Sequence, residues 1–183
     1  MIAGACLSTL GLRAADEKTA YQLIKEANRH VGEEVKDKVV QIRSEKSLGT
    51  LTPNIWYVVL YDKDATTKAT QVKLAGGVKM EVRREFRLLE LASKAHLPLD
   101  REKMKVDSDK AIEIATAEPT LKNLKLLSTR LTLERWEDAV VWKVRLWAAK
   151  LRNPAKDADI GEVFIAADTG KVVKNDLKIK RVD

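Results

Sequence analysis

The tripeptide Asp168-Thr169-Gly170 is the pattern that most directly suggests chemistry in this 183-residue sequence. Asp-Thr-Gly can carry the catalytic carboxylate of an aspartic peptidase, which needs two carboxylates that share a proton. The sequence holds one such tripeptide, so catalysis would require a homodimer with Asp168 from each copy. The alternative is a hairpin corner, because Asp and Gly favour tight turns and apolar residues alternate on both sides. We expect the corner, and we expect no enzyme activity.

Metal and phosphate chemistry have little support. His30 and Glu33 have a spacing that can place both side chains on one face of a helix, and His96 is the only other histidine. We expect solvated helix-end residues rather than a zinc site, since further ligands are missing. The sequence contains no glycine-rich phosphate loop, because "LAGGVK" is typical of a hairpin. We expect no cofactor and no metal.

The first residues, "MIAGACLSTLGLRAAD", resemble the apolar core and small-residue end of a secretory signal peptide without the basic segment before it. A short buried N-terminal segment is the alternative. Cys6 is the only cysteine, and a lipid anchor through it is disfavoured because Ala3 stands where a leucine is usual. We expect an exported protein, periplasmic or extracellular. No apolar run reaches the roughly 18 to 20 residues of a membrane helix.

The formal net charge of +7 favours anionic partners in general. Basic and acidic residues are interleaved, however, as in "EVRREFRLLELASK". This pattern is typical of solvated faces rather than of a phosphate-binding stripe, so nucleic acid is an unfavoured partner. An anionic polymer of the cell envelope remains an alternative partner.

The same order of elements is predicted twice. In residues 16–31, apolar residues at helical spacing follow a potential N-cap, Asp16, and predict a helix. Strand-like runs follow at 38–45, 54–63, 69–74 and 78–85, and in the last of them Val78, Met80 and Val82 are expected to form a buried face. Residues 85–96 and 107–119 predict two further short helices, the latter capped by Asp107 or Ser108. Strands are then expected within 124–136, 139–150 and 161–179.

The second half resembles a PepSY domain in "VDSDKAIEIA", "AVVWKVRLW" and the closing hairpin "GEVFIAADTGKVV". The resemblance covers about residues 105–179, although Ala166 stands where the family often has Asp. The first half matches only in the order of its elements. The resemblance implies an α+β fold of two tandem PepSY-like units, each a helix packed on a curved antiparallel sheet of three to four strands. We divide the chain into residues 1–15 as leader, 16–86 as first unit, 87–106 as linker with a short helix, and 107–183 as second unit.

PepSY domains occur in exported bacterial proteins and in peptidase propeptides, so the resemblance implies a non-enzymatic module that binds a protein. A peptidase or another envelope protein is the expected partner. The resemblance to PepSY domains implies no catalytic residues. The candidate contact residues are Trp147, Arg145 and Lys143, which share one face of a predicted strand, whereas Trp142 faces the core. Trp147 is either exposed beside these two cations as a binding residue or packed between the two halves.

Overall fold

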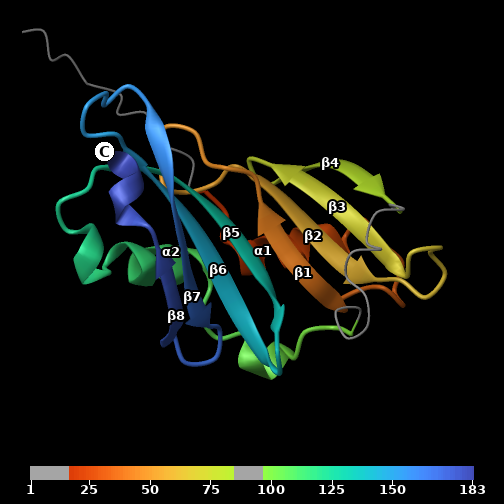
Figure 1. Cartoon of the computed structure of the whole chain (residues 1–183). Helices are drawn as coiled ribbons and strands as arrows, with labels where there is room; N and C mark the ends of the chain where they lie inside the picture. The colour runs from red at the N-terminus through yellow and green to blue at the C-terminus, as the bar shows by residue number, and fades with distance from the viewer. Residues whose placement is uncertain (1–16, 85–96) are drawn as a thin grey trace, which may run out of the picture.

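Two α-helices and eight strands form the framework of the computed structural model, which describes residues 17–84 and 97–183. One helix followed by four strands occurs twice along this part of the chain (Figure 1). The first series is α1 (Ala20–Asn28), β1 (Val39–Ser44), β2 (Ile55–Tyr61), β3 (Ala69–Ala75) and β4 (Val78–Arg83). The second is α2 (Ser108–Thr116), β5 (Leu126–Trp136), β6 (Ala139–Ala149), β7 (Asp157–Ala166) and β8 (Val172–Leu177). Short 3₁₀ helices lie at η2 (Arg101–Lys103), η3 (Pro119–Leu121) and η4 (Ile179–Val182).

All eight strands pair antiparallel in one sheet, in the order β4-β3-β2-β1-β5-β6-β7-β8. Strands β1 and β5 lie at the centre, and β4 and β8 form the two edges. The predicted α+β class is confirmed in this coarse sense. A sheet of three to four strands was expected in each half, whereas the structure has one sheet that runs through both.

Both helices pack on the same face of the sheet, as Figure 1 shows, and their apolar residues join one core. The buried positions of α1 are Ala20, Leu23, Ile24 and Ala27, which is the predicted helical spacing. Strand β2, with its β-branched and aromatic residues, sends alternate side chains into the same core. The opposite face of the sheet is therefore the one that the two helices leave uncovered.

The two helices meet at their N-termini, and one carboxylate caps both. Asp107 is the N-cap of α2, as predicted, and its Oδ1 accepts hydrogen bonds from the amides of Ser108 at 2.7 Å and Tyr21 at 3.1 Å. The hydroxyl of Ser108 accepts from the amide of Ala20, 2.9 Å away. Free amides at a helix start need acceptors, so these two residues satisfy donors from both helices at once.

We expect Asp107→Ala to lower the free energy of unfolding by about 2 kcal/mol, because each lost N-cap costs about 1 kcal/mol. Asp107→Asn keeps an oxygen acceptor at the same place, and its loss should stay under about 1 kcal/mol. Chemical denaturation of both variants measures the difference. Equal losses in the two variants would mean that the acceptor geometry at Asp107 is not what stabilises the helix starts.

The contact between β1 and β5 has few backbone bonds, and serine side chains complete it. Only Ile42 with Leu133 and Arg43 with Thr132 are paired in register. Beyond them, the amide of Leu131 donates to Ser44 Oγ at 2.9 Å, and the amide of Thr129 donates to Ser47 Oγ at 2.8 Å. Serine side-chain oxygens thus accept from two amides of β5, and the Ser47 amide donates to the Thr129 carbonyl at 2.8 Å. We call this contact the seam.

A buried carboxylate, Asp62, closes the hairpin between β2 and β3. The side chain of Asp62 is 2% exposed and accepts from the Thr70 hydroxyl at 2.6 Å and the Asp64 amide at 3.0 Å. Burial by itself would raise its pKa, but these hydrogen bonds and the Arg84 guanidinium outweigh burial and hold the pKa below its ordinary value. The ionised form therefore stabilises the fold.

We expect Thr70→Val to cost about 2 kcal/mol at neutral pH, because the hydroxyl bonds a charged group. The folded-state pKa of Asp62 lies below the unfolded one, so its stabilisation is present above about pH 4 and is lost as the pH falls through the folded value. Loss of the Thr70 bond moves the folded pKa back toward the unfolded one. The variant should therefore show a smaller decline of stability in acid, measured by urea denaturation at several pH values. An unchanged acid dependence would contradict this role.

The boundaries of several elements differ from those expected. Helix α1 begins at Ala20 after Thr19, whose amide donates to Gln22 Oε1 at 3.0 Å. The expected cap, Asp16, lies outside the described residues, as do the expected helix at 85–96 and the leader at 1–15. Strand β7 begins at Asp157, before the expected start at residue 161.

The prediction of a buried face on β4 is wrong. Val78, Met80 and Val82 are 64%, 61% and 41% exposed. Strand β4 is an edge of the sheet that the described residues form. A bulge in the β3–β4 pairing also leaves Met80 without a partner and breaks the simple alternation, because Lys73 pairs with Glu81 and Leu74 with Lys79.

Candidate functional site

The face of the sheet opposite the two helices carries polar, charged and aromatic side chains, together with a small buried apolar cluster of Val40, Val59 and Ala69, and we call it the open face. The polar character of this face follows from the alternation of side chains along each strand. Ile42 and Trp142 point into the core, whereas Arg43 and Lys143 point to the open face. Because the seam joins both halves into one sheet, the open face is continuous from β4 to β8.

Three aromatic rings on the open face each lie between two cationic side chains. The Tyr57 ring centroid is 4.8 Å from Arg43 Cζ and 5.3 Å from Lys73 Nζ. The neighbouring Tyr57 hydroxyl, with a smaller contribution from the Glu45 charge, raises the pKa of Lys73, so this ammonium is charged at physiological pH. Each cation is within the distance at which a ring face attracts it.

The other two rings belong to the second half of the chain. Trp147 in β6 has Lys46 Nζ at 4.7 Å and Arg130 Cζ at 5.7 Å from its ring centroid. Phe164 in β7 has Lys174 Nζ at 5.0 Å and Lys143 Nζ at 5.5 Å. Phe164 also packs against Trp136 of β5, with 5.4 Å between the ring centroids. The pattern of ring and flanking cations therefore spans both sides of the seam.

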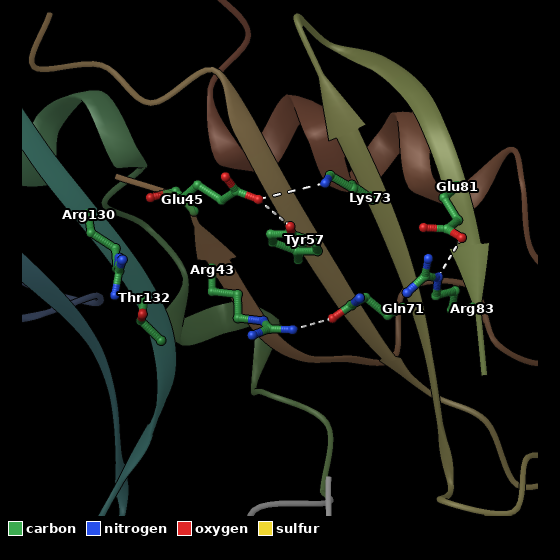
Figure 2. Close-up of a pocket in the computed structure, with 10 residues that line it drawn as sticks. Arg43, Glu45, Tyr57, Gln71, Lys73, Glu81, Arg83, Arg130 and Thr132 are labelled. Atoms are coloured by element: carbon green, nitrogen blue, oxygen red, sulfur yellow. Dashed lines mark hydrogen bonds and ion pairs between the residues drawn. The ribbon is translucent and has the colours of Figure 1, made fainter. Parts of the chain in front are cut away.

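A cavity of about 540 Å³ lies on the open face over the first half and the seam. Figure 2 shows its lining side chains on the side of the strands away from α1. The lining residues are Arg43, Ser44, Glu45, Tyr57, Gln71, Lys73, Glu81, Arg83, Arg130 and Thr132. An adjoining cavity of about 300 Å³ shares Arg43, Arg130 and Thr132 and continues over β6 and β7. The open face is thus hollowed where the two halves join.

Most charges around the two cavities are paired with one another. Lys143 pairs with Glu134, and Arg145 Nε lies 2.7 Å from Glu162 Oε1. Lys73 Nζ lies 3.7 Å from Glu45, whose carboxylate also accepts from the Tyr57 hydroxyl. These pairs cross from strand to strand and hold the open face in one arrangement.

Arg43 and Arg130 differ from these cations, since neither forms an ion pair with a carboxylate in residues 17–84 and 97–183. Arg43 donates to Gln71 Oε1 at 2.5 Å, as Figure 2 shows. Arg130 lies beside the Trp147 ring. The cavity therefore contains two guanidinium groups whose charge is not neutralised by the described part of the protein.

The three residues predicted to contact a partner lie together on the open face. Trp147 is only 9% exposed, so the alternative in which it packs at the junction of the halves fits better than an exposed indole. Lys46 of the first half and Arg130 of the second contact it. Lys143 and Arg145 are half-buried in ion pairs. Their role in binding a partner stays a prediction.

Sequence reasoning missed Tyr57, Arg43, Arg130 and Phe164. Alternation in "QIRSE" and "STRLTLE" could have placed both arginines on the polar side of their strands. Nothing in the sequence indicates that these strands are neighbours. The cavity depends on that pairing, so it could not be found without the structure.

The Asp168-Thr169-Gly170 corner joins β7 to β8, as predicted. The amide of Gly170 donates to the Ala166 carbonyl at 2.8 Å, and the Ala166 amide donates to the Lys171 carbonyl at 2.8 Å. The carboxylate of Asp168 is exposed and accepts no hydrogen bond from any described residue. The side-chain oxygen near the Lys171 amide is the Thr169 hydroxyl, at 3.5 Å.

We expect Asp168→Asn to change the free energy of unfolding by less than about 0.5 kcal/mol, because an exposed residue without partners contributes little. Thermal unfolding monitored by circular dichroism measures this. A loss above about 1 kcal/mol would show that the carboxylate stabilises the corner after all.

His30 and Glu33 do not face a common site. His30 Nε2 lies 3.2 Å from Glu26 Oε1, whereas Glu33 pairs with Lys36. The hydrogen bond from His30, aided by the charges of Arg29 and Lys18, lowers the pKa of Glu26. No group of three or more His, Cys, Asp or Glu side chains that could hold a metal occurs in the described ranges, from which His96 is absent.

Within residues 17–84 and 97–183, no helix has the length and apolar character needed to cross a membrane. Comparison of the chain with protein-family models, with curated proteins and with solved structures finds no match. The relation to the PepSY family rests on the resemblance of residues in the second half alone.

Proposed function

We propose that this chain is an exported, non-enzymatic protein of two tandem PepSY-like units that binds a protein partner through the open face. The observation that carries the proposal is one continuous face on which the rings of Tyr57, Trp147 and Phe164 each lie against two cations. Trp147 and Phe164 are only 9% and 6% exposed, so a partner would meet the flanking cations and Tyr57 first. Aromatic and arginine side chains are enriched at the energetically dominant positions of protein interfaces.

The division into two units is supported by the repeated order of one helix and four strands. The PepSY resemblance favours an envelope partner, and a peptidase restrained by this protein is the first candidate. Export is supported by the apolar leader-like residues 1–15, which lie outside the described part of the chain.

Most cations of the open face, Arg43 and Arg130 excepted, are held in cross-strand ion pairs, and this favours a protein partner over a polymer. A long anionic polymer binds best to a stripe of unpaired cations. Here Lys143, Arg145 and Lys73 each lie beside a carboxylate. Mixed charge with embedded rings is typical of a surface that recognises another protein surface.

Site-specific photocrosslinking in the cells that produce the protein tests the proposal. A photoreactive phenylalanine analogue replaces Lys73 or Thr132 on the open face, one in each half. Matched controls carry it at Lys25 on α1 or Glu113 on α2, which are exposed on the helix side of the sheet. We expect one protein to be captured from both open-face positions and from neither control.

Capture from the helix positions only, or equal capture from all four, would contradict the use of the open face. A parallel assay follows peptide hydrolysis by the purified protein. Hydrolysis that is sensitive to pepstatin and abolished by Asp168→Asn would establish the homodimeric peptidase instead. Binding to heparin that falls steeply with salt, without any crosslinked protein, would favour the anionic polymer.

A further inference from the structure

The arginine pair Arg43 and Arg130 carries an inference that deepens the proposed function and rests on it. We propose that these two guanidinium groups form a carboxylate-binding site in the cavity, and that an Asp or Glu side chain of the protein partner occupies it. Both arginines line both cavities of the open face.

The register places the backbones of the two arginines close together on one face, while their guanidinium groups lie on either side of the seam, Arg43 against Tyr57 and Arg130 against Trp147. Arg43 of β1 pairs with Thr132 of β5, and Arg130 lies two residues before Thr132 on the same strand. Residues two apart in a strand share a face, so Arg130 is the diagonal neighbour of Arg43 across the seam. The bond from the Leu131 amide to Ser44 Oγ keeps the strands adjacent between them.

Two neighbouring cations repel one another unless an anion lies between them. Elsewhere on the open face the protein supplies the carboxylate itself, as with Glu134 for Lys143 and Glu162 for Arg145. At Arg43 and Arg130 the described residues supply none. A guanidinium presents a planar fork of donors that fits a carboxylate with two parallel hydrogen bonds, so a carboxylate from outside completes this site.

The surroundings restrict the ligand to one carboxylate rather than a polyanion. Four carboxylates line the two cavities around the arginines: Glu45, Glu81, Glu134 and Glu162. They would repel the neighbouring charges of a polymer, but they suit a protein segment in which one acidic residue is flanked by basic or polar ones. The Gln71 amide and the Thr132 hydroxyl offer further polar contacts in the same cavity.

Nuclear magnetic resonance titration with N-acetyl-glutamate N-methylamide, which carries one carboxylate, tests the site. We expect saturable shifts of the side-chain Nε signals of Arg43 and Arg130, with a dissociation constant on the order of 1 mM. The glutamine analogue should cause no such shifts. The fluorescence of Trp147 should change in parallel, since its ring lies 5.7 Å from Arg130 Cζ, and Trp147→Phe identifies this contribution.

The double variant Arg43→Gln/Arg130→Gln should bind the probe at least tenfold more weakly. Arg152→Gln removes one positive charge from an exposed loop and should leave binding unchanged. The variant Arg43→Lys/Arg130→Lys keeps both charges without the planar forks and should be intermediate. Equal binding by the glutamine analogue, or an equal loss in Arg152→Gln, would overturn the site. Shifts with inorganic polyphosphate but none with the glutamate probe would overturn it in favour of an anionic polymer.

Crosslinking from position 73 in the variant Arg43→Gln/Arg130→Gln distinguishes failure of the carboxylate site from failure of the proposed protein-binding function on which it rests. Loss of the captured protein together with loss of probe binding supports both. Undiminished capture without probe binding refutes the carboxylate site and leaves the docking face intact. Probe binding without any crosslink from the open face refutes the proposed protein partner and leaves the carboxylate site supported.

Discussion

Replacement of Trp142 by alanine is expected to lower the free energy of unfolding by about 3 to 5 kcal/mol, the range for loss of a buried aromatic side chain. Trp142 is fully buried in β6 and belongs to the common core. Its indole donates to the Val106 carbonyl at 2.8 Å, and its ring stacks on Tyr21 of α1 with 6.4 Å between centroids. The substitution therefore leaves a cavity at the place where β6 and both helix starts meet.

Tyr21 strengthens this expectation, because its hydroxyl donates to the same Val106 carbonyl at 2.6 Å. Burial, with a contribution from the charge of Asp107, raises the pKa of Tyr21 far above its ordinary value. The hydroxyl thus stays protonated as a donor well into alkaline solution, but its position depends on the ring of Trp142.

Chemical denaturation measures the effect of Trp142→Ala, and Trp136→Ala is its control. Trp136 is half-buried at the end of β5 and packs on Phe164, so its loss should cost about 1 to 2 kcal/mol. Equal losses for the two tryptophans would show that Trp142 is not the centre of the core.

Gly161→Ala is expected to lower the free energy of unfolding by about 3 to 4 kcal/mol, combining backbone strain with lost strand hydrogen bonds. Gly161 has φ of +101°, a conformation that L-residues rarely adopt, and a Cβ there would lie 2.1 Å from the Asp176 carbonyl oxygen. Gly161 pairs with Leu177, so the clash would displace the end of β8 from β7. Hydrogen exchange should then be faster in β8 than in β2.

Gly49→Ala is the control that distinguishes the cost of backbone strain from the cost of a steric clash. Gly49 also has a positive φ of +74°, but a Cβ there would meet nothing within 4 Å. Its substitution should cost only about 1 kcal/mol, the strain of a left-handed residue. A similar loss at both glycines would mean that β8 tolerates a side chain at residue 161.

Local features of this fold could be predicted from the sequence because they depend on neighbouring residues. The apolar spacing at Leu23, Ile24 and Ala27 predicted α1, and Asp107 was recognised as a cap. The alternation around Trp142 predicted which side of β6 is buried. The corner at residues 168–170 followed from turn chemistry in the same way.

Features that depend on which strands are neighbours could not be predicted. Val78 and Met80 alternate like a buried face, but their exposure results from the edge position of β4. The nearness of Arg43 and Arg130 depends on the pairing of β1 with β5, which are more than 80 residues apart in the chain. Periodicity reports the face of a side chain and contains no information about the strand beside it.

The seam has a consequence for the symmetry of the molecule. Outward from β1 and β5, the strands follow in the same order on both sides, and the two central strands run antiparallel. Half a turn about an axis normal to the sheet at the seam therefore brings the strand order of one half onto that of the other. This is the arrangement of two identical subunits in an isologous dimer, here joined in one polypeptide. Because both halves belong to one polypeptide, their sequences can differ on the two sides of this axis, which is impossible in a dimer of identical subunits. The open face accordingly has the tyrosine ring of β2 on one side of the axis and the tryptophan ring of β6 on the other.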